Sequence, residues 1–118
     1  MDAFEELEVW KRSSRLCCEV YKALRESREW GLKDQLTRSA LSVPSNIAEG
    51  YERNSLREFV RFLQIAKGSC GELRTQLYIA QDIGVLEAKR ARRFIQESTE
   101  LSRMLQTLIG RLEARDSG

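Results

Sequence analysis

The sequence predicts an all-α protein, an antiparallel up-down-up-down four-helix bundle with a proline-kinked second helix. Apolar residues recur at alternating spacings of three and four positions along four segments, which is the period of an amphipathic helix. Short connections join these segments, and such connections place consecutive long helices antiparallel to each other. No segment has the alternating pattern of a strand. We therefore expect residues 1–118 to form one domain, with helices at about residues 5–29, 33–52, 56–83 and 88–113.

The first helix is expected to bury one apolar seam and to end near Trp30 and Gly31, because glycine suits the left-handed residue that follows a helix. The seam is Leu7, Trp10, Ser14, Cys17, Tyr21 and Leu24. The second helix repeats Leu36, Ala40, Val43, Ile47 and Gly50 on its buried face, and this repeat passes through the only proline, Pro44. A proline inside a helix removes one backbone hydrogen bond and crowds the preceding turn, at a cost of about 3 kcal/mol. We therefore predict a kink at Pro44.

The third helix begins with a capping box, Ser55 to Glu58, in which each side chain binds a free backbone amide of the other residue. It ends at Gly84. Its core positions are Phe59, Phe62, Ala66, Leu73, Leu77 and Ala80. Those of the fourth helix are Phe94, Ser98, Leu101, Leu105, Leu108 and Leu112.

Two helices carry a second apolar stripe, although a single bundle needs only one per helix. The residues expected to line an interface between subunits are Val9, Leu16, Val20, Ile65, Ile79 and Ile83. The alternative is a set of isolated surface aliphatics, which are common on monomers. Head-to-tail contacts between subunits must close into a ring if they are not to form a filament.

Basic residues gather in two places, although the net charge of the chain is only +2. Arg53, Arg57 and Arg61 are spaced at i, i+4 and i+8, where like charges repel each other on a helix face. A second cluster at the start of the fourth helix comprises Lys89, Arg90, Arg92 and Arg93. A phosphate backbone would relieve both repulsions and release counterions. These seven residues are the candidate nucleic-acid-binding residues, and the alternative is a solvated charged face.

Five polar residues lie beside the core stripes and are expected to form a structural hydrogen-bonded network. They are Arg38, Asn46, Glu49, Glu72 and Gln76. A Glu49–Glu72 pair is the one candidate for acid–base or metal chemistry, but di-metal bundles use Glu-x-x-His motifs and this chain contains no histidine. We therefore expect no enzyme activity, no metal or cofactor and no small-molecule substrate. No apolar run is long enough for a membrane span, and the odd number of cysteines together with the absence of a signal peptide favours a cytoplasmic protein.

A proline-centred motif, SVPSNIAEG at residues 42–50, has the strongest resemblance to a known family. Further matching segments are LEVW at 7–10, GLKDQLTRSA at 31–40, EFVRFL at 58–63, Ala66, Gly68-Ser69, Glu72-Leu73 and TQL at 75–77. Over roughly residues 4–86 the chain resembles the bacterial 23S rRNA intervening-sequence proteins, also called S23-like proteins. The resemblance implies a cytoplasmic four-helix bundle, often encoded within an intervening sequence of large-subunit ribosomal RNA, that assembles as a ring-shaped homopentamer. A similar bundle is the pentameric accessory protein of diversity-generating retroelements, from which this chain departs in its weak net charge.

The function that we expect is that of a non-enzymatic, ring-forming module that binds structured RNA or a ribonucleoprotein through its basic surface. The alternative is a protein-interaction scaffold or accessory subunit, for example of a reverse transcriptase, without RNA affinity of its own.

Overall fold

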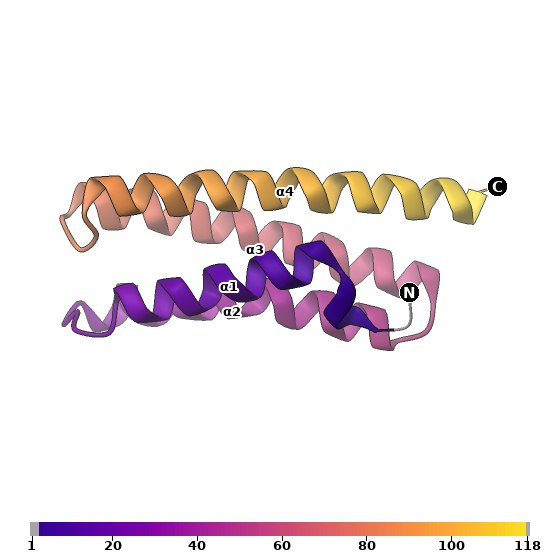
Figure 1. Cartoon of the computed structure of the whole chain (residues 1–118), viewed down its shortest axis with the longest axis horizontal. Coiled ribbons are helices and arrows are strands. Elements are labelled where there is room, and N and C mark those ends of the chain that lie inside the picture. The colour runs from indigo at the N-terminus through magenta and orange to yellow at the C-terminus, as the bar shows by residue number, and fades with distance from the viewer. Residues whose placement is uncertain (1–2, 118) are drawn as a thin grey trace.

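The computed structural model describes residues 3–117 as four long helices packed side by side, preceded by one short helical turn (Figure 1). The turn is η1 (Phe4–Glu6), and the helices are α1 (Glu8–Ala23), α2 (Trp30–Glu52), α3 (Leu56–Asp82) and α4 (Ala88–Ser117). The bundle measures 49 × 21 × 19 Å. The α1–α2 and α3–α4 connections lie at one end, and the α2–α3 connection lies at the other end with both termini (Figure 1). The predicted all-α bundle is confirmed.

The core runs along the whole bundle and is built almost entirely from aliphatic side chains. The predicted buried face of α2 is confirmed, because Leu36, Ala40, Val43, Ile47 and Gly50 are all buried. The core positions of α3 and α4 also follow the predicted repeat, although Phe59 and Leu108 are only partly buried. Burial of such side chains contributes about 25 cal/mol per Å² of apolar surface, which is the main favourable free energy of folding here.

The predicted end of the first helix is wrong. α1 ends at Ala23, and Trp30 begins α2 instead of terminating the preceding helix. Residues 25–29 read Arg-Glu-Ser-Arg-Glu and offer the core no apolar side chain, so a longer helix would gain nothing from packing. The chain reverses there, and Lys33 Nζ donates to the Arg25 carbonyl oxygen at 3.1 Å across the connection.

The predicted buried face of α1 is also displaced around the helix. The core of α1 includes Val9, Leu16 and Val20, which were expected in a subunit interface, whereas Tyr21 is 45% exposed. Val9, Leu16 and Val20 are therefore removed from the candidate interface. Cys17 and Leu24 are buried as predicted. Both lie on the helix between the rest of the predicted core seam and the stripe formed by Val9, Leu16 and Val20.

α2 continues through Pro44 without interruption, and the kink there stays a prediction. Half of the predicted capping box forms at the N-terminus of α3, because the Glu58 backbone N–H donates to Ser55 Oγ at 3.3 Å. Within residues 3–117 the Glu58 carboxylate pairs with Arg53 and Arg61 instead of the Ser55 backbone N–H. No helix among residues 3–117 is apolar enough over a sufficient length to cross a bilayer.

Candidate nucleic-acid interface

The two basic clusters lie at opposite ends of the bundle. Arg53 is the C-terminal cap of α2, and Arg57 and Arg61 lie in the first two turns of α3. The second cluster, Lys89 to Arg93, occupies the first turns of α4. Because α3 has 27 residues, the two clusters are separated along the bundle by about 40 Å at 1.5 Å per residue. They do not form one continuous surface.

Arg53 does not share a helix face with Arg57 and Arg61, which corrects the argument from spacing. The break is at Asn54, which has a φ of 57° and turns the chain between α2 and α3. Arg53 and Arg61 nevertheless converge on Glu58, at 3.7 Å from Nη1 of Arg53 and 2.9 Å from Nε of Arg61. Their guanidinium carbons lie 4.9 and 4.5 Å from the centroid of the Phe62 ring.

These contacts reduce the positive charge that the first cluster offers to a ligand. A hydrogen bond from Arg61 lowers the pKa of Glu58, so this carboxylate is ionised at neutral pH and partly neutralises both arginines. Arg53 also pairs with Glu49 at 3.0 Å. Within residues 3–117, Arg57 has no ion pair and is exposed, so it is the least engaged cation of this cluster.

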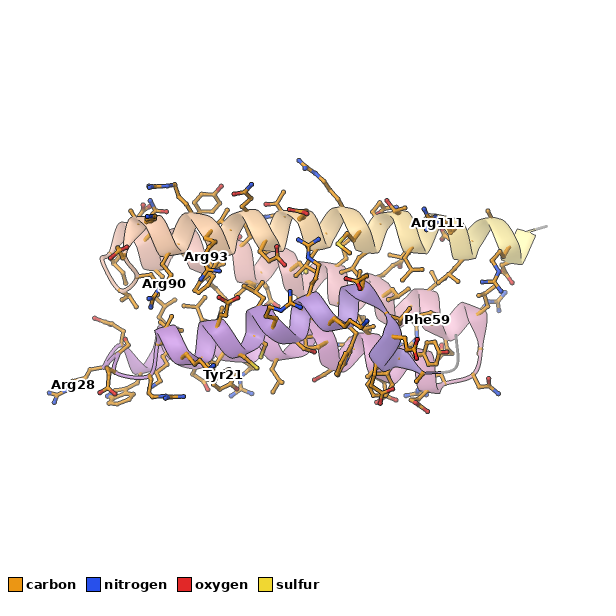
Figure 2. The ribbon with its side chains drawn as sticks, viewed as in Figure 1. Tyr21, Arg28, Phe59, Arg90, Arg93 and Arg111 are labelled. Carbon is orange, nitrogen blue, oxygen red and sulfur yellow. The ribbon has the colours of Figure 1, made fainter. Side chains whose placement is uncertain are left out.

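The second cluster surrounds an open hollow of about 520 Å³ next to the α3–α4 connection. Its lining residues are Glu87, Lys89, Arg90, Arg92, Arg93 and Gln96. Arg93 pairs with Glu19 of α1 at 2.9 Å. In the described part of the chain, Lys89, Arg90 and Arg92 form no ion pair, and all three are exposed. Figure 2 shows Arg90 and Arg93 on α4 beside α1, at the end where the α1–α2 connection carries Arg28. This cluster keeps more of its charge available than the first.

The predicted polar network does not form as expected. Arg38 pairs with Asp34 and Glu49 pairs with Arg53, each along its own exposed helix surface. Glu72 is exposed, and the buried Oε1 of Gln76 has no hydrogen-bond partner among the described residues. Only Asn46 enters a network, in which it binds Ser42 and Ser42 binds Ser69, two serines outside the predicted set.

That network joins α2 to α3. The hydroxyls of Ser42 and Ser69 are hydrogen-bonded at 2.8 Å. Asn46 Nδ2 donates to the Ser42 carbonyl oxygen at 2.8 Å and to its hydroxyl at 2.9 Å. Because Ser69 is buried, the pair satisfies polar groups that would otherwise be costly at the helix interface. Its role is structural.

A second contact that the sequence analysis missed links α1 to α4. Arg12 donates to both carboxylate oxygens of Glu97, at 2.9 and 2.6 Å, and lies 3.0 Å from Glu100. The hydrogen bonds to Glu97 raise the pKa of Arg12 above its ordinary value. The sequence contains no signal for this pair, since residues 85 positions apart meet only in the fold.

The α3 residues of the predicted subunit interface remain on the surface. Ile65, Ile79 and Ile83 are between 41% and 57% exposed, and each is a large aliphatic side chain. They lie along the side of α3 that is next to α2, since Ser69 of α3 binds Ser42 of α2 on that side. The exposed Glu72 interrupts this apolar row, because it lies midway between Ile65 and Ile79 on the same helix face. The aliphatic side chains of the row are the part that a contact with another protein surface would bury.

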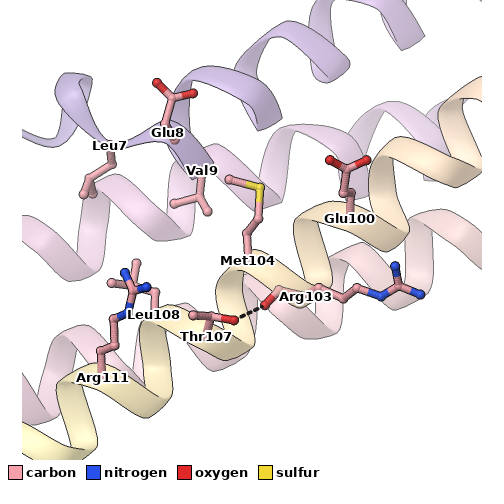
Figure 3. Close-up of a pocket in the computed structure, with 9 residues that line it drawn as sticks. All are labelled: Leu7, Glu8, Val9, Glu100, Arg103, Met104, Thr107, Leu108 and Arg111. Carbon is pink, nitrogen blue, oxygen red and sulfur yellow. Dashed lines mark hydrogen bonds between the residues drawn. The ribbon is translucent and has the colours of Figure 1, made fainter.

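An apolar groove of about 440 Å³ lies between the start of α1 and the C-terminal half of α4 (Figure 3). Leu7 and Val9 of the α1 side face Met104 and Leu108 of α4 across it. Arg103 and Arg111 also line the groove. The groove contains no histidine or cysteine, and no cluster of three metal-ligating side chains occurs among residues 3–117.

Comparisons with known proteins agree with the expected family. Residues 5–107 match a family model described as 23S rRNA-intervening sequence protein. The fold is similar to the crystal structure of a protein with unknown function from the S23 ribosomal protein family of Bacteroides thetaiotaomicron VPI-5482, with a TM-score of 0.80. The two sequences are 25% identical, and the alignment covers 86% of this chain and 97% of that one. No curated protein matches the sequence.

Proposed function

The chain belongs to the 23S rRNA-intervening sequence protein family, and we propose that it is a non-enzymatic module that assembles into a ring and binds structured RNA or a ribonucleoprotein. The basic hollow at the start of α4 is the primary contact. The observation that carries the proposal is the set of three cations there, Lys89, Arg90 and Arg92, that have no carboxylate partner in the described structure.

The position of these cations strengthens their attraction for phosphate. They lie in the first turns of α4, where the free backbone N–H groups already carry partial positive charge. Placing cations there is unfavourable in the free protein, and an anionic ligand would remove that repulsion. Arginine also presents parallel N–H donors that match two phosphate oxygens.

The cluster at the other end of the bundle has a secondary role in this proposal. Glu58 already neutralises part of the charge of Arg53 and Arg61, so a phosphate group must compete with that carboxylate. Arg57 is free of this competition. The exposed aliphatic row of α3, Ile65, Ile79 and Ile83, supports assembly because its burial between subunits would gain hydrophobic free energy.

A second candidate function, a protein-interaction scaffold without RNA affinity, is favoured by the apolar groove between α1 and α4. Met104, one of its lining residues, has a flexible side chain of the kind that adapts to different partners. In this alternative the basic residues are only a solvated surface.

The test is binding of a fluorescein-labelled RNA hairpin, followed by anisotropy at 50 and 200 mM KCl. We expect the double variant Lys89→Glu/Arg92→Glu to bind about tenfold or more weakly at the lower salt and to show a smaller salt dependence. The matched control is Arg103→Glu/Arg111→Glu, which makes the same charge change elsewhere on α4. A second pair, Arg57→Glu/Arg61→Glu, is expected to keep its fold and to lose less affinity.

If all three double variants lose the same RNA affinity, the effect comes from net charge alone, and the α4 hollow is removed from the proposal. Wild-type affinity no greater than that of the Lys89→Glu/Arg92→Glu variant would favour the scaffold. Far-UV circular dichroism of each variant checks that the helices are intact.

A further inference from the structure

An exposed tyrosine adjoins the basic hollow of α4. A second hollow, of about 550 Å³, lies between the last turns of α3 and the second and third turns of α4. It is lined by Tyr78, Gln81, Asp82, Arg92, Ile95 and Gln96. Arg92 and Gln96 line both hollows, so the two form one continuous surface with four cations at one side and an aromatic ring at the other.

Tyr78 has no packing role that accounts for it. Its side chain is 54% exposed, although its neighbour Leu77 is fully buried. No hydrogen bond or ring contact of Tyr78 occurs within residues 3–117. The ring is therefore open to a planar ligand, and stacking on an RNA base is a contact that any base can make.

The polar groups around Tyr78 fit the rest of a nucleotide. Gln81 and Gln96 each carry an amide that can donate to and accept from the edge of a base. The carboxylate of Asp82 repels a phosphate group but accepts hydrogen bonds from a base amino group. The phosphate is thus directed toward Arg92 and the cations beyond it, and the base toward Tyr78.

From this arrangement we infer that the surface shared by the two hollows holds an unpaired nucleotide of RNA, with its base on Tyr78 and its phosphate at Arg92. The inference rests on the proposed function and specifies which part of the RNA is bound. A base inside a duplex is stacked on both faces and cannot lie on Tyr78, so the contacted segment is a single-stranded end, loop or bulge.

The experiment compares two fluorescein-labelled RNA hairpins, one with a blunt end and one with a 3′ extension of four unpaired uridines. We expect the wild-type protein to bind the extended hairpin more tightly. Tyr78→Ala should remove this advantage, with a loss of about tenfold for the extended hairpin and no change for the blunt one. Tyr78→Phe keeps the ring and should keep the advantage. Tyr21→Ala is the matched control, because Tyr21 is also exposed but lies on α1.

Each other outcome overturns the inference. If Tyr78→Ala binds both hairpins with wild-type affinity, or loses the same affinity for both, Tyr78 does not hold an unpaired base. If the Tyr78 result is negative but Lys89→Glu/Arg92→Glu still lowers the affinity for the blunt hairpin, the proposed function stands and only the stacking site is contradicted. If the wild-type protein binds neither hairpin, both fall together. Because Tyr78 is a surface residue, its variants are expected to fold, which circular dichroism checks.

Discussion

Gly50 of α2 passes so close to Phe62 of α3 that a β-carbon on Gly50 would lie 2.6 Å from the Phe62 Cβ. The same atom would lie 3.2 Å from the Phe59 ring and 3.3 Å from the Phe59 carbonyl oxygen. Since the nearest atom is itself a β-carbon, it cannot move aside without shifting the α3 backbone. The glycine that ends the SVPSNIAEG segment is therefore explained by the close approach of two helices next to their connection.

We predict that Gly50→Ala destabilises the protein, even though alanine favours a helix over glycine by about 1 kcal/mol. Overpacking costs about 1–3 kcal/mol, and the backbone contact places this site at the upper part of that range. The midpoint of thermal unfolding, followed at 222 nm, should fall by several degrees. The control is Gly71→Ala, where a β-carbon would meet no atom within 4 Å and the midpoint should rise. A rise in both variants would show that α2 and α3 separate readily at Gly50.

The residues of α1 show where periodicity alone was insufficient. Leu7, Trp10 and Tyr21 share one stripe with helical spacing, and Val9, Leu16 and Val20 share another. Both stripes satisfy the same pattern, so the pattern does not decide which one faces the core. In the fold, the smaller branched side chains of the second stripe enter the core, and the amphipathic Tyr21 is left half-exposed. α2 carried only one apolar stripe, and its buried face was predicted correctly.

The sequence predicted which basic residues belong to the candidate nucleic-acid interface, but not how they are arranged in space. The charge pattern identified Arg53, Arg57 and Arg61, but the turn at Asn54 breaks the helix that their spacing assumed. Pairs that join distant parts of the chain, such as Arg12 with Glu97 and Ser42 with Ser69, depend on how the helices are arranged. The link between Tyr78 and Arg92 is of the same kind, because it exists only where the end of α3 meets the start of α4.

A second prediction concerns the pair between α1 and α4. Arg12→Lys should lower the free energy of unfolding by about 1 kcal/mol, because lysine keeps the charge but loses the paired hydrogen bonds to Glu97. The Arg12 side chain is only 23% exposed, so solvent screens it less than a surface pair. The control is Arg38→Lys, whose pair with Asp34 is largely exposed and whose loss should change stability by less than about 0.5 kcal/mol. Urea unfolding measures both, and equal effects would contradict a role for burial.

A third prediction concerns the three cysteines, which differ in burial. Cys17 and Cys70 are buried and Cys18 is exposed. Burial raises the pKa of the Cys17 and Cys70 thiols to about 11, so both stay protonated at pH 8. Because the thiolate is the reactive form, iodoacetamide should modify Cys18 rapidly in the folded protein, and all three only in denaturant. Mass spectrometry counts the additions, and fast modification of Cys70 in the native protein would contradict its burial.

The same shifts have a consequence for stability at high pH. A thiol whose pKa is raised by folding binds its proton more tightly in the folded state than in the unfolded chain. Its contribution to stability is complete below the ordinary value of 9.0 and is lost as the pH rises through about 11. The free energy of unfolding should therefore fall less between pH 8 and pH 11 in Cys70→Ala than in the wild-type protein. Urea unfolding at these two pH values measures the difference.

The last prediction tests assembly. Ile79 in the last turn of α3 and Ile83 at its C-cap are both exposed, and a charge at either position would have to be dehydrated to enter a subunit contact. If this row joins subunits, Ile79→Glu/Ile83→Glu should convert an oligomer near five chains into a monomer, as measured by size-exclusion chromatography with light scattering. The control is Leu41→Glu, an equally exposed aliphatic on α2 outside the row, which should leave the mass unchanged. An oligomer that survives the double substitution would place the contact elsewhere, and the groove between α1 and α4 would then be the next surface to test with Leu108→Glu.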